Sequence, residues 1–283
     1  MSVEQTLTRQ RILLRETSQY LKRDFRKYIF NALGMWVWIF NLNLNKGDKY
    51  RSTYYFFRNI DDVLDGDRDV EENPLDYANS IKMAIEKEVF DFNRYPILQT
   101  AQTSLEYLER VKKPGDQPKE LMIQLIDAII SDHLRIKHRK VLSQAELLEE
   151  YRKQFYPMHN LQLICVGSNV GFQEDVDYFP IFQARVQSLS DLQNDWSKHL
   201  FNIPKEVLEK AQIDAQSTTY EELILSPVVR RWIYEEAVDC LERLGDTKKI
   251  LSRKLRGSQE KYSRIIYRGL IIGLEHSLGR ILR

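Results

Sequence analysis

The chain has 283 residues, enough for one large domain or two small ones with a sizeable core. Its net charge of +1 gives no electrostatic reason to expect a nucleic-acid partner. Its two cysteines, Cys165 and Cys240, are too few for a disulfide framework or a cysteine-rich zinc site. With only 11 glycines and 8 prolines, the composition favours helix over sheet.

Helix-spaced apolar residues recur along the chain, and proline, glycine and capping residues mark the helix ends. The predicted helices run over Val3–Phe30, Gly47–Leu64, Asn73–Phe90, from Tyr95-Pro96 to the turn at Lys112–Pro118, Glu120–His138, from a Ser143/Glu146 capping box onward, Tyr178–Ser197, Val228–Leu244 and Ser258–Leu282. Pro157 is expected to break or kink its helix, and Gly167 and Gly171 to bracket a loop or helix end. No segment alternates over strand length. We therefore predict an all-α fold of about ten or more helices in a single domain, residues 1–283.

The apolar segments are short. The longest, Ala32–Phe40, cannot span a bilayer, and the opening stretch MSVEQTLTRQRILLRE is polar and interrupted. We expect a soluble, cytoplasmic protein, with peripheral contact to a membrane surface left open. The basic run RIKHRK, Arg135 to Lys140, is interpreted as a helix end whose charges complement the dipole. Nearby Asp132 is expected at the surface, with a role as a buried polar partner as the alternative.

The stretch YYFFRNIDDVLDGDRD, Tyr54 to Asp69, is rich in carboxylates. Asp61 and Asp65 are four residues apart and share a helix face, near a helix C-terminus where negative charge is disfavoured. A magnesium ion, which takes one or two carboxylates together with water and phosphate oxygens, would remove both penalties. Arg58, one turn earlier, could hold a carboxylate or a phosphate. Taken alone, the pair is typical of a solvated, acidic helix end.

The stretch SLSDLQNDWSKH repeats the pattern, with Asp191 and Asp195 four residues apart on another predicted helix. Gln187, one turn before Asp191, carries an amide oxygen that can ligate magnesium. Two aspartate pairs on two otherwise apolar helices indicate a place for a magnesium–diphosphate cluster. Such a cluster activates an allylic diphosphate as a leaving group by neutralising its charge.

The segment YYFFRNIDDVLDGD resembles the first aspartate-rich motif of the squalene/phytoene synthase family, and FQARVQSLSDLQNDWSKHLFNIPKEVLEK resembles the second. The resemblance covers most of the chain. It implies an isoprenoid-synthase-type helical bundle around a central cavity, with Mg²⁺ as cofactor and a prenyl diphosphate as substrate. By motif position it implies that Arg58 lies near a diphosphate and that the metal residues are Asp61, Asp65, Gln187, Asp191 and Asp195.

Two tyrosines are further candidates for the site. Tyr54, one turn before Arg58, is the aromatic residue of its run expected to face the cavity, where its ring could stabilise a carbocation. The resemblance implies a tyrosine near the diphosphate on the last helix, and Tyr267 is the candidate. Packing in the core is the alternative for both residues.

The second motif departs from the family pattern. Ser190 and Leu200 stand where the family carries arginine, and Asn202 where it carries tyrosine; Lys198 or His199 could replace one lost cation. Upstream, EYRKQFYPMHNLQLICVGSNVG is bulky where the family has small residues. We expect the room for a long prenyl chain to be filled by Phe155, Tyr156, Met158 and His159.

The resemblance implies a magnesium-dependent transferase that condenses prenyl diphosphates and releases diphosphate. The departures keep one alternative open, a terpene synthase or a prenyltransferase to an aromatic or amine acceptor that uses one prenyl diphosphate. A second alternative is a non-catalytic assembly factor. The sequence leaves open the prenyl chain length, the number of diphosphate sites, the acceptor, the product and the oligomeric state.

Overall fold

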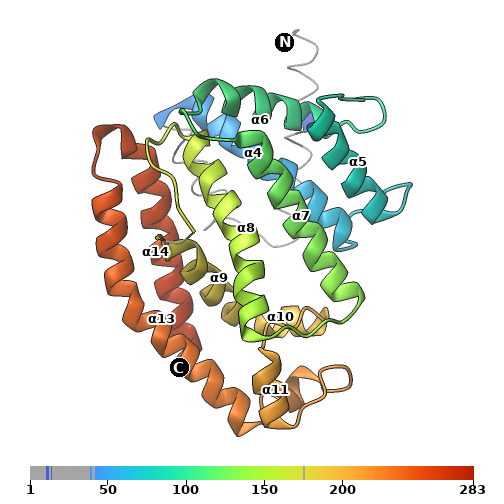
Figure 1. The fold of residues 1–283 in the computed structure, drawn as a ribbon, viewed down its shortest axis with the longest axis vertical. Helices are drawn as coiled ribbons and strands as arrows, with labels where there is room; N and C mark the ends of the chain where they lie inside the picture. The colour runs from blue at the N-terminus through green and yellow to red at the C-terminus, as the bar shows by residue number, and fades with distance from the viewer. Residues whose placement is uncertain (1–10, 13, 15–38, 40–41, 175) are drawn as a thin grey trace. The chain divides into compact units, whose positions relative to one another are not determined.

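The computed structural model describes residues 11, 12, 14, 39, 42–174 and 176–283. The helix predicted at Val3–Phe30 and the apolar run Ala32–Phe40 lie almost entirely outside these residues. Every regular element in the described part is helical, which confirms the all-α prediction (Figure 1). The α-helices are α4 Leu44–Leu64, α5 Pro74–Lys87, α6 Leu98–Val111, α7 Pro118–Lys137, α8 Gln144–Cys165, α9 Phe179–Ser190, α10 Leu192–Ser197, α11 Lys205–Ala211, α12 Tyr220–Leu223, α13 Pro227–Lys254 and α14 Lys261–Ile281, with a 3₁₀ turn at Ser258–Glu260.

The chain divides into two compact units. Unit 1 comprises Met1–Ile130, Pro157–Gly171 and Gly257–Gly269, and unit 2 comprises Ser131–Tyr156, Phe172–Arg256 and Leu270–Arg283. Helices α7, α8 and α14 contribute residues to both units. The single-domain organisation stays a prediction.

In unit 1, α4, α5 and α6 pack on one another. Helix α4 begins at Asn43, whose side chain accepts a hydrogen bond from the Lys46 backbone N–H at 3.0 Å. Phe56, Ile60 and Val63 are fully buried at helical spacing and fix which face of α4 meets the core. Each such side chain contributes about 1.5–3 kcal/mol by leaving water. The opposite face of the same helix is therefore free to carry the polar residues of the first aspartate motif.

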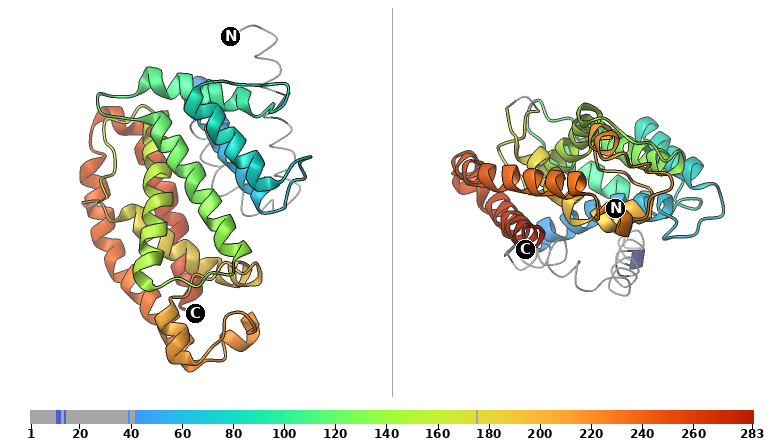
Figure 2. Two further views of the ribbon diagram at one scale, coloured as in Figure 1. Left: turned by 45° about the vertical axis from the view of Figure 1, so that its right-hand side comes forward. Right: turned by 90° about the horizontal axis from the view of Figure 1, so that it is seen from below.

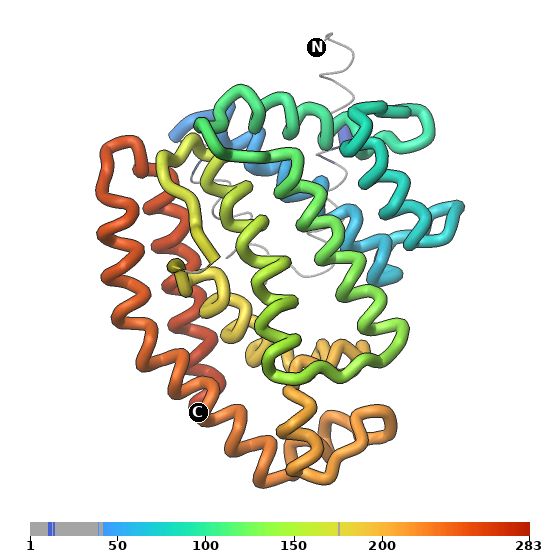
Figure 3. The backbone as a smooth tube through the Cα atoms, in the orientation of Figure 1, coloured from blue at the N-terminus to red at the C-terminus, as the bar shows by residue number. Residues whose placement is uncertain are grey.

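In unit 2, α13 packs on α9 and α11 (Figure 2). The chain runs from α10 through a short loop into α11 (Figure 3), and residues of this segment belong to an apolar cluster. The cluster consists of Leu192, Trp196, Phe201, Ile203, Leu208, Ala215, Leu223 and Val229. The rings of Trp196 and Phe201 are in tilted contact with centroids 4.7 Å apart, and the Trp196 indole N–H donates to the Thr218 carbonyl at 2.9 Å. These contacts anchor the short helix that carries Asp195.

The predicted helix boundaries hold at several points and fail at others. The capping box at Ser143 and Glu146 is present, with Ser143 N–H donating to the Glu146 carboxylate at 2.8 Å. Of the two outcomes expected at Pro157, a break is wrong, because α8 continues to Cys165. Gly167, at φ +69°, then ends the segment as predicted. Helix α13 runs ten residues beyond the predicted Leu244, and the short helices α11 and α12 were not predicted.

No helix in the described part of the chain is both long and apolar enough to cross a lipid bilayer.

Candidate functional site

The first aspartate motif lies in the last two turns of α4, in unit 1. The Arg58 guanidinium contacts Asp61 directly, and its Nε lies 2.8 Å from the Asp62 carboxylate. The Asp62 side chain is only 5% exposed, whereas that of Asp61 is 34% exposed. One arginine thus neutralises part of the charge of two neighbouring aspartates, and Asp62, which sequence reasoning left outside the site, helps to fix Arg58.

Asp65 is the C-cap of α4, and its backbone N–H donates to the Asp61 carbonyl at 2.8 Å. Asp61 and Asp65 therefore lie one helical turn apart, as predicted, and Asp65 is exposed. Gly66 follows at φ +74°, a left-handed conformation that ends the helix at little cost for glycine. Asp67 and Asp69 are exposed.

The aromatic run before Arg58 is mainly core. Tyr55, Phe56 and Phe57 are 3%, 0% and 8% exposed, whereas Tyr54 is half-buried with its ring edge against Tyr55. Tyr54 is thus the member of the run with accessible surface, which is compatible with its predicted place at a cavity.

The second motif lies in unit 2 at a break between two helices. Asp191 ends α9 and precedes α10, so the single helix predicted at Tyr178–Ser197 is wrong. The one-turn spacing survives the break, because the Asp195 N–H donates to the Asp191 carbonyl at 2.9 Å. The half-buried Gln187 lies one turn earlier, and its carbonyl accepts from the Asp191 N–H at 2.9 Å.

Helix α10 ends directly after this motif, at the half-buried Lys198. His199 has φ +62°, its N–H donates to the Trp196 carbonyl, and the Leu200 N–H donates to the Asp195 carbonyl at 2.9 Å. This is the hydrogen-bond pattern of a Schellman motif, with histidine where glycine is usual. It fixes the backbone of Asp195 from the C-terminal side.

Asp195 carries a carboxyl group whose pKa is shifted by its surroundings. Burial raises the pKa of its carboxyl to about 7, and the charge of Asp191 adds to the effect. A hydrogen bond from Asn202 acts in the opposite direction, and the charge of Asp132 raises the pKa further. A cation bound at this carboxylate would favour its charged form, so the environment fits a metal ligand.

A buried arginine, Arg135, donates a hydrogen bond to Asn202. Arg135 is 6% exposed and donates to the Asp132 carboxylate at 2.8 Å, the Asn202 side-chain oxygen at 3.0 Å and the Phe201 carbonyl at 3.2 Å. The Asn202 amide nitrogen in turn donates to Asp195 at 2.9 Å. Arg135 and Lys137 lie in the last turn of α7, as the interpretation of a basic helix end predicts, but Arg135 is buried, whereas Lys137 to Lys140 are exposed. The three-residue spacing of Asp132 and Arg135 was the available signal for this pair.

Tyr267 lies deep in unit 1. It is 1% exposed, and its hydroxyl is 3.1 Å from Nδ1 of His159, which is fully buried. Burial raises the pKa of Tyr267 well above its usual value. The hydroxyl of Tyr267 is thus engaged with a histidine, and its predicted contact with diphosphate stays a prediction.

The bulky residues of α8 are core side chains. Phe155, Tyr156 and His159 are 8%, 2% and 0% exposed, and Met158 is half-buried. These side chains occupy volume inside the units, in agreement with the expectation that this helix fills space.

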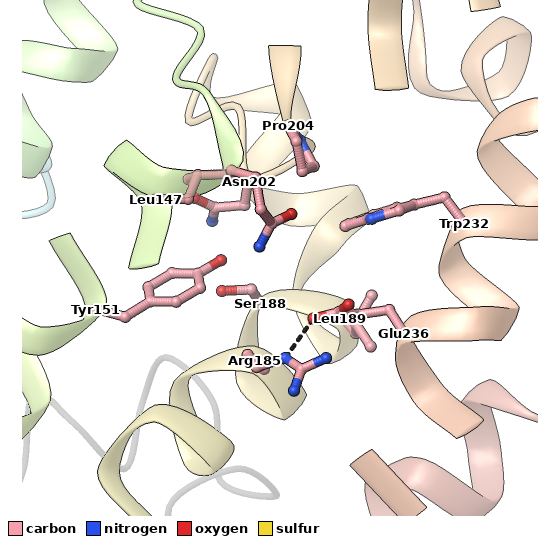
Figure 4. Close-up of a pocket in the computed structure, with 10 residues that line it drawn as sticks. Leu147, Tyr151, Arg185, Ser188, Leu189, Asn202, Pro204, Trp232 and Glu236 are labelled. Atoms are coloured by element: carbon pink, nitrogen blue, oxygen red, sulfur yellow. Dashed lines mark hydrogen bonds and ion pairs between the residues drawn. The ribbon is translucent and has the colours of Figure 1, made fainter. Parts of the chain in front are cut away.

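A narrow pocket in unit 2 borders the second motif, with space for about one water molecule (Figure 4). Asn202 lines it, the hydroxyls of Tyr151 and Ser188 point toward each other, and Arg185 bonds to Glu236 at 2.5 Å. Burial raises the pKa of Tyr151 to about 12, which a hydrogen bond with Ser188 partly offsets. The pocket is too small for a prenyl chain.

Within the described residues, no three histidine, cysteine, aspartate or glutamate side chains come together as ligands of one metal ion. Each motif offers a pair of carboxylates. That donor set fits magnesium, which retains water and takes substrate phosphate oxygens in addition to one or two carboxylates.

The fold is of the helical isoprenoid-synthase type. Among solved structures, the chain is similar to squalene synthase HpnC from Alicyclobacillus acidocaldarius, with a TM-score of 0.66 and 15% sequence identity over 99% of this chain and 95% of that one. No protein-family model matches the chain, and no curated protein matches its sequence. The likeness shows the fold and confirms the predicted fold class.

Proposed function

We propose that the chain is a magnesium-dependent enzyme that ionises an allylic prenyl diphosphate, most simply a prenyltransferase of the squalene/phytoene synthase type. The observation that carries the proposal is the presence of two one-turn aspartate pairs in a fold shared with a squalene synthase. An unused pair of like charges only destabilises its helix, so two such pairs favour a function in binding cations.

In this proposal Asp61, Asp65, Asp191 and Asp195 hold magnesium, with Gln187 as an amide ligand. Bound magnesium would neutralise the diphosphate and make it a better leaving group. The bond between the allylic carbon and the diphosphate oxygen then breaks with its electron pair on the oxygen. Arg58, fixed by Asp62, is placed to orient the first motif, and the ring of Tyr54 is the candidate for stabilising the allylic cation.

The acceptor of that cation decides the reaction. Condensation with a second prenyl diphosphate follows the resemblance and would release diphosphate at each ionisation. A reaction with one diphosphate, either cyclisation or transfer to an aromatic or amine acceptor, is favoured by a specific observation. Ser190 and Leu200 stand at the two positions where the family carries arginine, so neither supplies a cation for a second diphosphate. Lys198, a candidate to replace one of these cations, is the C-cap residue of α10.

The test is pyrophosphate release from geranyl, farnesyl and geranylgeranyl diphosphate, with and without Mg²⁺ and with and without aromatic and amine acceptors. Release that requires Mg²⁺ supports the proposal. A dimeric hydrocarbon would identify condensation, and a monomeric hydrocarbon or alcohol would identify cyclisation or hydrolysis. Absence of release with every chain length and acceptor would overturn the proposal and favour a non-catalytic factor.

A further inference from the structure

We propose that Arg135 is a positioning residue for Asp195, which it reaches through the side chain of Asn202; this inference rests on the proposed function of Asp195 as a metal ligand. Arg135 lies on α7, Asn202 in the loop after α10, and Asp195 on α10 itself. All three belong to unit 2. The connection joins residues that are distant in sequence, and neither aspartate motif predicts it.

The geometry forms a continuous chain of hydrogen bonds. Nη2 of Arg135 donates to Oδ1 of Asn202 at 3.0 Å, and Nδ2 of Asn202 donates to Oδ2 of Asp195 at 2.9 Å. Arg135 and Asn202 are each only 6% exposed. Water therefore competes little for either bond, and the bonds are correspondingly strong.

The two bonds together determine which way the Asn202 amide faces. A guanidinium can only donate hydrogen bonds, and a carboxylate can only accept them. The amide oxygen must therefore face Arg135 and the amide nitrogen must face Asp195. A flipped amide would place its NH₂ against the guanidinium and its oxygen against the carboxylate, which would lose both bonds and introduce two repulsions.

Arg135 is itself held in place. Its guanidinium bonds to the Asp132 carboxylate at 2.8 Å and to the Phe201 carbonyl at 3.2 Å. Within the described residues its buried Nε has no hydrogen-bond partner. A buried arginine with an unsatisfied N–H is costly compared with an apolar side chain of similar size, which indicates a role other than stability.

The arrangement differs in kind from a direct ion pair. Asp132 offsets the charge of Arg135, and a neutral amide is what contacts Asp195. Asp195 is thereby oriented without a cation on its carboxylate that would compete with a metal ion. Such an outer partner is expected to affect metal affinity about 10- to 100-fold, as other hydrogen-bond partners of metal ligands do.

The test is binding of Mn²⁺ in the presence of inorganic pyrophosphate, measured by isothermal titration calorimetry on the full chain. Arg135→Met and Asn202→Ala should each weaken binding about 10- to 100-fold. The double variant should bind no more weakly than the weaker single variant, because the two residues act in series. Arg231→Met, which removes an arginine whose side chain is 79% exposed in the same unit, should leave binding unchanged.

A second measurement does not need metal. In the metal-free protein, the two side-chain amide protons of Asn202 should give separate NMR signals that exchange slowly with solvent. Arg135→Lys, which keeps the charge but loses the planar fork, should speed that exchange and weaken Mn²⁺ binding less than Arg135→Met does. If Arg135→Met does not fold, the Arg135→Lys variant and the exchange rate of the Asn202 amide protons test the positioning role instead.

The outcomes separate the two claims. If the wild-type chain binds no Mn²⁺ with pyrophosphate, the proposed function fails, and the positioning role falls with it. If the wild type binds but the Arg135 and Asn202 variants bind equally well, only the positioning role is overturned. The positioning role is also overturned if the losses of Mn²⁺ affinity multiply in the double variant. It is likewise overturned if the exchange of the Asn202 amide protons is unchanged in Arg135→Lys.

Discussion

The two aspartate motifs have the same spacing but differ in how the protein handles their charge. In the first motif, Arg58 contacts Asp61 and Asp62 directly. In the second, Asp195 receives a hydrogen bond from the neutral amide of Asn202, and the cation, Arg135, stands one residue further away. Sequence spacing alone therefore does not determine the electrostatics of a motif, since the partner residues come from other turns and other helices.

The two motifs also end differently. Helix α4 ends at Gly66 and α10 at His199, both with positive φ. Glycine adopts this conformation freely, whereas histidine is strained there by the contact of its Cβ with the backbone. The second motif is thus the one with a half-buried acid whose pKa is raised and with a strained helix end, a combination that is common where function competes with stability.

The largest expected effect is the loss of activity when either pair is removed. Asp61→Ala with Asp65→Ala, and separately Asp191→Ala with Asp195→Ala, should each lower pyrophosphate release more than about 100-fold, because metal ligands stabilise charge in the transition state. Steady-state assays with far-UV circular dichroism check this. Asp69→Ala, at an exposed acid beside the first motif, is the matched control and should stay near wild type. Activity above about a tenth of wild type in either double variant would contradict the metal assignment.

The next largest effect concerns the direct ion pair of the first motif. Arg58→Gln removes the cation that contacts Asp61 and the buried Asp62, and should lower the free energy of unfolding by about 3 kcal/mol. Urea denaturation measures this difference. Adding Asp62→Asn should recover part of the loss, because it removes the buried charge. If the stability losses of Arg58→Gln and Asp62→Asn simply add in the double variant, Arg58 and Asp62 are not energetically coupled.

Asp195 gives a pH-dependent effect of intermediate size. Its folded-state pKa of about 7 lies above the value of about 3.9 in an unfolded chain, so the folded protein binds this proton more tightly. The stability from this group is fully present below about pH 4 and is lost as pH rises through about 7. Metal-free Asp195→Asn should therefore be more stable than wild type at pH 8 by about 1–3 kcal/mol.

This gain should shrink toward zero near pH 4, as followed by urea denaturation with a chelator across that range. Asp69→Asn, which removes an exposed charge, serves as the control and should leave the free energy of unfolding near that of wild type. A gain for Asp195→Asn that is constant with pH would show that the carboxyl does not titrate differently on folding.

The smallest effects concern the helix ends. Gly66→Ala should destabilise by about 1 kcal/mol, because the left-handed backbone is strained with a Cβ, although no atom lies within 4 Å of that position. His199→Gly should stabilise by up to about 1 kcal/mol for the converse reason. Thermal denaturation of Gly66→Ala and His199→Gly measures both changes in stability. Opposite signs are expected, and equal signs would contradict the account of the two ends.

Much of the fold could be predicted from periodicity and capping residues. The all-α class, the extent of α4 and the capping box of α8 depend on local patterns that sequence displays directly. The break at Asp191 and the continuation of α8 through Pro157 depend on tertiary packing, which overrides local preference. The continuation of α13 beyond the predicted end at Leu244 is likewise not indicated by the local sequence pattern.

The sequence predicts only those features of the candidate site that depend on local spacing. The one-turn spacing of both aspartate pairs is a local property, and the structure retains it. The buried state of Arg135 and the bond from Asn202 to Asp195 join α7 to the loop after α10, so no local pattern indicates them. The pairing of Tyr267 with His159 is likewise a contact between distant segments.

The most direct test of the central claim is Mg²⁺-dependent release of pyrophosphate from a prenyl diphosphate, compared among the wild type and the two double aspartate variants. We expect the wild type to release pyrophosphate, this release to disappear with chelator, and the rate to fall more than about 100-fold in each double variant. Release that persists without metal, or that survives the loss of either pair, would contradict it.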